Sequence, residues 1–257
     1  MALTSRLKKF WNNYISLTEL FVLPMKNSKI STLLNTVLFP SIMIVFFRRI
    51  YGELAMDRIQ FILTGSLIIG AISTSLSTLS SKINNIVTSD GMEFFLGFPI
   101  SKFEFILALI TAELIIYLPS SIIVLAFGKA YLGIHSNTNY IMLIIFLILL
   151  SLSLVGIGAI IGYKSKNFNQ NLTISSLVSY GIVFLSPIYY PIDSLNVVLR
   201  SLSYFFPSTY AANVIRGLIL DSSSIPNKEI LINLSVLMLF CLLSFYILSR
   251  VFKWFLE

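Results

Sequence analysis

The chain alternates long apolar runs with short polar connections, and six of the runs are long enough to cross a bilayer. They lie at residues 30–47, 59–79, 103–127, 140–163, 172–190 and 230–251. A hydrocarbon core about 30 Å thick needs roughly 20 apolar residues per helix, whereas a transmembrane barrel would show short alternating segments. The pattern therefore predicts an all-α integral membrane protein with six transmembrane helices.

Residues 1–28 have a different pattern, with apolar side chains at helical spacing on one side and basic or amide side chains on the other. The apolar set is Leu3, Leu7, Phe10, Trp11, Tyr14 and Phe21, and the polar set is Arg6, Lys8, Lys9, Asn12 and Asn13. An amphipathic helix of this composition suits the headgroup region of a membrane. A soluble helix that packs on a partner is the alternative.

The connection at residues 80–102 predicts a short helix between the second and third runs. Asp90 can cap its N-terminus, Glu93 completes a capping box, and Gly97 with Pro99 ends it. One face of this helix is apolar and holds Met92, Phe95 and Leu96. We expect a short helix with exposed aromatic side chains at the mouth of two membrane spans to be a docking element.

The third and fourth runs contain residues that are unusual in lipid. Ser101 followed by Glu104 signals the start of the third helix. Glu113 lies deep in that run, where a carboxyl group is costly, so it should face the bundle interior or water. A substrate or gating contact and a hydrogen bond to a neighbouring helix are both open roles. In the fourth run, Gly158 and Gly162 form a small-xxx-small pair that permits close helix approach.

Prolines divide the stretch at residues 187–227 into pieces too short and too polar to span a membrane. Two apolar stripes are present, one with Leu195, Val198, Leu199, Leu202 and Phe206 and another with Tyr210, Val214 and Leu218. Two short amphipathic helices that enter the outer half of the bundle and return fit this pattern, with the re-entrant segment at 191–228. An amphipathic loop resting on the surface is the alternative.

Composition and charge agree with a membrane protein. Hydrophobic residues make up 56% of the chain and charged residues 11%, and the mean hydropathy is +0.89. The net charge of +7 comes from basic residues that flank the runs, so it does not indicate nucleic acid. With six spans both termini share one side, which carries eleven of the lysines and arginines against seven opposite and is therefore predicted to be cytoplasmic.

Arg48 and Arg49 depart from this orientation, because they follow the first run on the supposed outer side. Glu53 and Asp57 could pair with them, and a misplaced first span would also explain them.

The sequence lacks the motifs of catalysis. His135 is the only histidine, which argues against histidine-dependent triads and zinc sites of the His-x-x-x-His type. No phosphate-binding G-x-x-x-x-G-K-[ST] loop occurs, since Gly128-Lys129 lacks the earlier glycine and the following hydroxyl. We therefore expect no enzyme, no metal site and no cofactor bound by this chain, and any energy for transport must come from another chain.

Three features together resemble the ABC-2 type permeases, the membrane halves of bacterial and archaeal ATP-driven exporters. They are the N-terminal amphipathic helix, the loop motif EFFLGFPIS at residues 93–101, and the segment FPSTY at 206–210 continued to Arg216 and Gly217. The resemblance covers essentially the whole of residues 1–257 as one transmembrane domain. It implies that the short helix is a coupling helix seated on a separate ATPase, which binds ATP and Mg. It also implies that two permease copies or homologues form the pathway.

The resemblance assigns roles to individual residues. Coupling to the ATPase would involve Asp90, Met92, Glu93, Phe94, Phe95, Leu96 and Pro99. The substrate path or gate would involve Glu113, Ser175, Ser179, Tyr189, Tyr190, Phe206, Pro207, Tyr210 and Arg216. The resemblance implies a multi-pass protein of the prokaryotic cell membrane with both termini in the cytoplasm. Membrane lipid would contact its outer surface.

The pattern of Pro207, Thr209, Tyr210 and Arg216 looks more like the drug-exporter branch, whose cargo would be an amphipathic small molecule, drug or peptide. Export of a polysaccharide or glycolipid is the alternative within the family. An ion-coupled transporter or a channel, with Glu113 as the protonatable group, is the alternative outside it.

Overall fold

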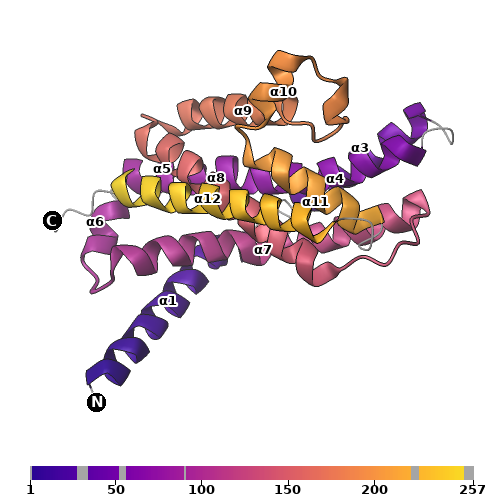
Figure 1. Ribbon diagram of the computed structural model, residues 1–257. Helices are drawn as coiled ribbons and strands as arrows, with labels where there is room; N and C mark the ends of the chain where they lie inside the picture. The colour runs from indigo at the N-terminus through magenta and orange to yellow at the C-terminus, as the bar shows by residue number, and fades with distance from the viewer. Residues whose placement is uncertain (1, 28–33, 52–55, 90, 221–225, 252–257) are drawn as a thin grey trace.

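The computed structural model describes residues 2–27, 34–51, 56–89, 91–220 and 226–251, and these residues form helices and connecting turns without a strand (Figure 1). The helices in order are α1 Ala2–Asn27, η1 Leu34–Leu38, α3 Phe39–Tyr51, α4 Met56–Ser73, η2 Thr74–Thr78, α5 Leu79–Thr88, α6 Gly91–Leu96, α7 Lys102–Leu132, α8 Tyr140–Lys164, α9 Phe168–Leu185, η3 Ile192–Ser194, α10 Val197–Ser203, α11 Pro207–Leu220 and α12 Asn227–Val251. The predicted all-helical class is confirmed. The short elements η1 and η2 are π-helices, and η3 is a 3₁₀-helix.

Four helical stretches in the described part of the chain are long and apolar enough to cross a membrane. They are Phe61–Thr88, Lys102–Leu132, Tyr140–Lys164 and Asn227–Val251. These correspond to the second, third, fourth and sixth predicted runs. The first run corresponds to η1 and α3, with residues 28–33 outside the described residues, and the fifth corresponds to α9. The count of six spans therefore stays a prediction.

The helix boundaries differ from the apolar runs where capping residues decide them. Helix α9 begins at Phe168 because the Asn167 side chain accepts a hydrogen bond from the backbone N–H of Gln170. Helix α7 continues past the third run to Leu132 and ends at Gly133, whose φ of 70° is left-handed. The predicted start of α7 is confirmed, because Ser101 and Glu104 form a reciprocal capping box.

The second span is longer than predicted, because α4, η2 and α5 follow one another without a break to Thr88. The apolar pattern ends the second run at Leu79 and places residues 80–88 in the connection at 80–102. In the structure Ser80 and Asn84 are fully buried, and both are hydrogen bonded to other helices. The polar residues of α5 therefore serve helix packing, and the connection is confined to residues 89–101.

Helix α8 lies at the centre of the bundle and packs against α5, η2, α11 and α12. Two glycines allow the approach to η2 and α5. A Cβ atom at Gly158 would collide with the carbonyl oxygen of Ser75, and one at Gly162 would lie 2.5 Å from that of Ser80. The predicted close helix approach at this glycine pair is confirmed.

The buried apolar side chains form two clusters along the bundle. One joins α4, α7, α8 and α11 and includes Leu67, Leu125, Phe146 and Ile215. The other joins α1, α5, α6 and α7 and includes Phe21, Phe95 and Phe105. Helix α6 and the end of α12 lie at one end of the bundle, and the turn after α7 lies at the other (Figure 1).

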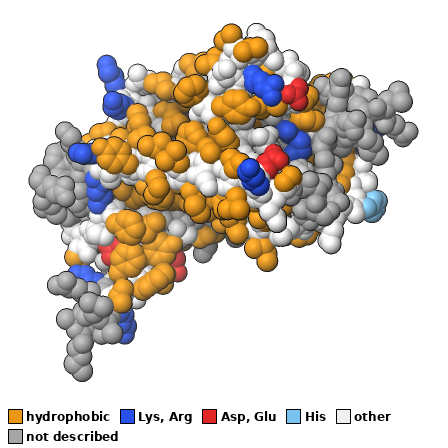
Figure 2. Space-filling model, in the orientation of Figure 1, with side chains coloured by type: hydrophobic (Ala, Val, Ile, Leu, Met, Phe, Trp, Pro, Cys, Tyr) orange, Lys and Arg blue, Asp and Glu red, His pale blue; other side chains and the backbone are white. Residues whose placement is uncertain are grey.

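Hydrophobic side chains also cover much of the visible outer face of the bundle, while lysines and arginines lie at the end that carries α6 and also in the region of α10 and α11 (Figure 2). A largely apolar outer face with scattered basic residues is the surface expected of a helical membrane protein.

Candidate functional site

Helix α6 and its two flanking turns project between α5 and α7 at one end of the bundle (Figure 1). Helix α6 ends at Leu96, and a turn follows it. The N–H of Gly97 donates to the carbonyls of Glu93 and Phe94, and the N–H of Phe98 donates to the carbonyl of Phe95. Pro99 follows, and its carbonyl oxygen accepts a hydrogen bond of 3.2 Å from Asn13 of α1. The predicted short helix is therefore present and is held at its C-terminal end.

The two sides of α6 have different surroundings. Phe94 is 60% exposed and Phe98 is 50% exposed, and their rings contact each other at 5.0 Å in an edge-to-face arrangement. Glu93 is also exposed. Together Glu93, Phe94 and Phe98 form a surface that we call the α6 face.

Phe95 does not belong to this face, contrary to the expectation that its side chain is exposed. It is 7% exposed, and its ring lies 5.8 Å from that of Phe21 and 5.0 Å from that of Phe105. The physical reason is that α1 and α7 together cover this side of α6, and a pattern within six residues cannot reveal that. Asp90 and the side chains of Met92 and Leu96 lie outside the described residues.

Helix α1 packs along α7 and supports the α6 region. The Tyr14 hydroxyl donates to the Thr111 hydroxyl at 2.8 Å, and Asn13 also approaches the Glu104 carboxylate that caps α7. The opposite stripe of Leu7, Trp11 and Ile15 remains exposed. The helix expected at the N-terminus is therefore present as α1, with one apolar side packed inside the chain and another exposed, and its place at the membrane interface stays a prediction.

Glu113 of α7 is ion-paired with Lys82 of α5, with 2.6 Å between Nζ and the carboxylate oxygen. Lys82 also donates to the backbone carbonyl of Phe21 in α1, at 3.4 Å. Of the two roles left open for Glu113, a partner within the bundle is the contact observed.

The predicted gate residues that follow α9 in the chain lie near α4 and α11, away from α6. The hydroxyls of Ser186 and Ser208 lie 2.7 Å apart and join the end of α9 to the start of α11. Arg216 donates to the Pro187 carbonyl at 3.0 Å, and its guanidinium lies 3.9 Å above the ring of Phe61. These contacts fix the turn at residues 186–191 against α4 and α11.

Three tyrosines make further contacts around the turn at residues 186–191 and helix α11. The ring of Tyr189 occupies the space that a side chain at Gly65 would need, so it packs directly on the backbone of α4. Tyr190 donates to the carbonyl of Phe184, and Tyr210 donates to that of Tyr204. We call residues 186–216 with these contacts the outer segment.

The two short helices predicted in this stretch are present as α10 and α11, but they differ in burial. Helix α11 begins at Pro207, a favoured first helical residue, and packs against α4, α8 and α12. Its stripe residues Val214 and Leu218 are buried. Helix α10 instead leaves Val197 and Val198 exposed, 81% and 67%.

The predicted path residues Ser175 and Ser179 do not join the outer segment. Ser175 is fully buried on α9 and donates back to the carbonyl of Asn171. The Ser179 hydroxyl is buried without a hydrogen-bond partner among the described residues. The predicted sites therefore occupy separate places, with α6 at one end, Glu113 next to α5, the serines on α9 and the outer segment at the other end.

A buried polar cluster that the sequence pattern does not predict lies between α5, α8 and α9. Asn84 donates to the carbonyls of Gly162 and Ser165, and Asn171 contacts Ser80 and Ser81. The sequence does contain a sign that the helix continues here, because Leu79, Ile83, Ile86 and Val87 are apolar and at helical spacing. This spacing extends the second span through the residues that form the cluster.

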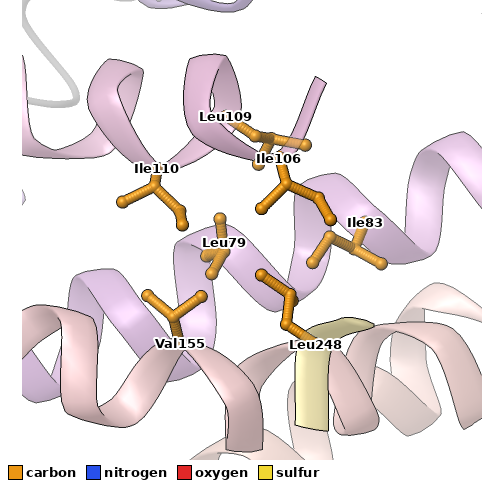
Figure 3. A pocket seen from close by; sticks show the side chains of 7 residues that line it. All are labelled: Leu79, Ile83, Ile106, Leu109, Ile110, Val155 and Leu248. Atoms are coloured by element: carbon orange, nitrogen blue, oxygen red, sulfur yellow. The ribbon is translucent and has the colours of Figure 1, made fainter. Parts of the chain in front are cut away.

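A cavity of about 10 Å³ lies where α5, α7, α8 and α12 meet. Figure 3 shows its lining side chains, which converge from all four helices and are entirely apolar: Leu79, Ile83, Ile106, Leu109, Ile110, Val155 and Leu248. A space this small without a polar group is a packing void and not a binding site. The part of the chain that the structure describes holds no group of three or more side chains suited to a metal ion.

A protein-family model described as ABC-2 type transporter matches residues 14–220. No individual curated protein matches the sequence. The matched region begins within α1 and includes α6, Glu113 and the outer segment through Arg216.

Proposed function

The chain belongs to the ABC-2 type transporter family, and on that premise we propose that it is the permease subunit of an ATP-driven exporter. Its cargo would be an amphipathic small molecule, drug or peptide. A separate ABC ATPase would bind ATP and Mg and supply the energy, since this sequence contains no phosphate-binding loop.

The observation that carries the proposal is the α6 face. Glu93, Phe94 and Phe98 are exposed on a short helix that α1 and α7 hold in place from behind. Exposed aromatic side chains on a rigid support make effective anchors in protein interfaces, because little conformational entropy is lost on binding. The α6 face therefore suits the seat of the ATPase, at an end that would be cytoplasmic together with both termini in a prokaryotic cell membrane.

The outer segment would close the opposite end of the pathway. Its contacts between Ser186 and Ser208, Arg216 and Pro187, and Tyr189 and Gly65 hold α11 and the turn at residues 186–191 against α4. We propose that α10 and α11 are re-entrant and that cargo leaves when these contacts open.

We also propose that two copies assemble with two ATPases. Aromatic and aliphatic side chains on α9 and α10 are exposed, among them Tyr180, Phe184 and Val197. A second copy and membrane lipid would share this surface. The ion-coupled alternative depends on Glu113 as a protonatable group, and the ion pair with Lys82 gives Glu113 a structural role that needs no ion coupling.

The test is co-purification of the cognate ABC ATPase with the permease from membranes. Phe94→Ala and Phe98→Ala should each reduce the amount of bound ATPase about tenfold, because truncating a central aromatic anchor commonly costs 1–2 kcal/mol or more. Phe127→Ala is the matched control, since Phe127 is partly exposed on α7 near the other end of the bundle. Equal ATPase binding by the α6 variants and the control would exclude the α6 face as the seat.

A further inference from the structure

Helix α5 leads directly into α6 and is bound by polar contacts to four other helices. It is therefore the element best placed to pass a movement of α6 to the rest of the bundle. The contacts form two groups on α5, one around Lys82 and one around Asn84.

The Lys82 contact ties α5 to α7 and α1. The ammonium group of Lys82 pairs with Glu113 and also donates to the carbonyl of Phe21. Because α5 and α7 precede and follow α6 in the chain, this contact holds together the two helices from which α6 projects, with α1 beside them. Its partners are a buried carboxylate and a backbone oxygen, so breaking it would leave a charge without a partner in an apolar setting.

The Asn84 contact ties the same helix to the turn between α8 and α9. The Asn84 amide donates to the carbonyl of Gly162 at 3.0 Å and to that of Ser165 at 2.8 Å, and the side chain is fully buried. The orientation of the amide is fixed, because the opposite orientation would place its oxygen against both carbonyl oxygens.

The neighbouring Asn171 strengthens this connection from α9. Its amide nitrogen donates to the Ser80 hydroxyl at 2.7 Å, and its oxygen accepts from the Ser81 hydroxyl at 3.0 Å. Gly162 is also the point where α8 approaches Ser80 too closely for any side chain. Polar contacts and close packing thus coincide at one level of the bundle.

We propose that Asn84 is the positioning residue that couples α6 to α8 and α9, so that a displacement of α6 by the ATPase moves the start of α9 with it. This inference rests on the proposed function. The Lys82 contact holds α5 against α7 and α1, and the Asn84 contact transfers the movement of α5 to α8 and α9, which continue toward the outer segment.

The matched test compares Asn84→Ala with Asn85→Ala, because Asn85 is the next residue of α5 and is exposed. In liposomes containing the permease and its cognate ATPase, Asn84→Ala should lower the ATP hydrolysis rate per assembled complex about tenfold. The reason is that Asn84→Ala removes both hydrogen bonds that tie α5 to the end of α8 and to Ser165. Asn85→Ala should hydrolyse ATP like the wild type, and both variants should still bind the ATPase.

A distance measurement separates coupling from general stability. Spin labels at Asn85 and Lys166, both exposed, would report the spacing of α5 and the α8–α9 turn, with Cys241→Ser removing the native thiol and unlabelled chains diluting the labelled ones. We expect the wild-type distance to be the same without nucleotide and after trapping with ADP and vanadate. In Asn84→Ala the trapped state should give a longer or broader distance distribution.

Ser81→Ala provides a milder variant if Asn84→Ala folds poorly, because it removes only the bond to the Asn171 oxygen. It should shift the trapped distance in the same direction by a smaller amount. Assembled complexes in which Asn84→Ala and Ser81→Ala hydrolyse ATP normally and keep the wild-type distances would overturn the inference alone. If the ATPase fails to bind even the wild-type chain, the proposed function fails and the inference falls with it.

Discussion

Replacing Phe95 should release α6 from the bundle without changing the α6 face itself. Phe95 is the one described aromatic residue of α6 that points inward, and its ring contacts Phe21 of α1 and Phe105 of α7. Phe95→Ala removes both contacts and leaves a space between three helices. The exposed Phe94, by contrast, contributes little to holding α6 in place.

The size of the effect follows from the burial of Phe95. Truncation of a buried phenylalanine costs about 3–5 kcal/mol, of which each aromatic pair supplies about 0.5–1.5 kcal/mol. Helix α6 has few other anchors, so most of this cost should appear as local opening. A change of about 3 kcal/mol corresponds to a more than hundredfold increase in the open population.

Hydrogen exchange of the backbone amides at the end of α6 measures that population. The N–H groups of Gly97 and Phe98 bond to carbonyls within α6, so they exchange only when the helix opens. Phe95→Ala should accelerate their exchange about a hundredfold, Phe95→Leu much less, and Phe94→Ala hardly at all. Similar rates in Phe95→Ala and Phe94→Ala would refute the assignment of an inner and an outer side to α6.

Three further changes test packing and capping, each by thermal unfolding in detergent. Ser101→Ala removes the cap of α7 and should destabilise by about 0.5–2 kcal/mol, whereas Ser101→Asn should retain most of the stability. Val155→Ile adds a methylene at the apolar cavity and should raise stability by up to about 1 kcal/mol, so a lower unfolding temperature would show that the space is already filled. Gly158→Ala should lower the unfolding temperature strongly because its Cβ meets the Ser75 carbonyl, while Gly181→Ala, which has open space, should not.

The pattern of the sequence predicted the helices whose limits are set locally. Helix α8 matches its apolar run within a residue, and the start of α7 follows from the Ser101 and Glu104 pair. The outer segment also divides into short helices at its prolines, as expected. In each case the deciding groups lie within a few residues of the boundary, where capping and proline chemistry act.

Features that depend on distant parts of the chain could not be predicted in this way. The sequence pattern places the polar residues of α5 in a loop. Their hydrogen-bond partners Gly162, Ser165 and Asn171 lie in α8, just after it, and in α9, about 80 to 90 residues further along the chain. The same limit applies to Phe95, whose burial is decided by Phe21 in α1. Burying a polar side chain without a hydrogen-bond partner costs free energy. Partners on other helices remove that cost, and these partners are not visible among the neighbouring residues of the sequence.

Helix α1 stabilises the α6 region by direct contacts. A helix that only rested in the headgroup region would leave the connection between α5 and α7 to its own residues, and six helical residues have little stability alone. Instead α1 supplies the Phe21 ring behind Phe95, the Phe21 carbonyl for Lys82 and the Asn13 amide for Pro99. The α6 face is therefore backed by contacts from both α1 and α7, and its stability depends on residues that lie far from it in the sequence.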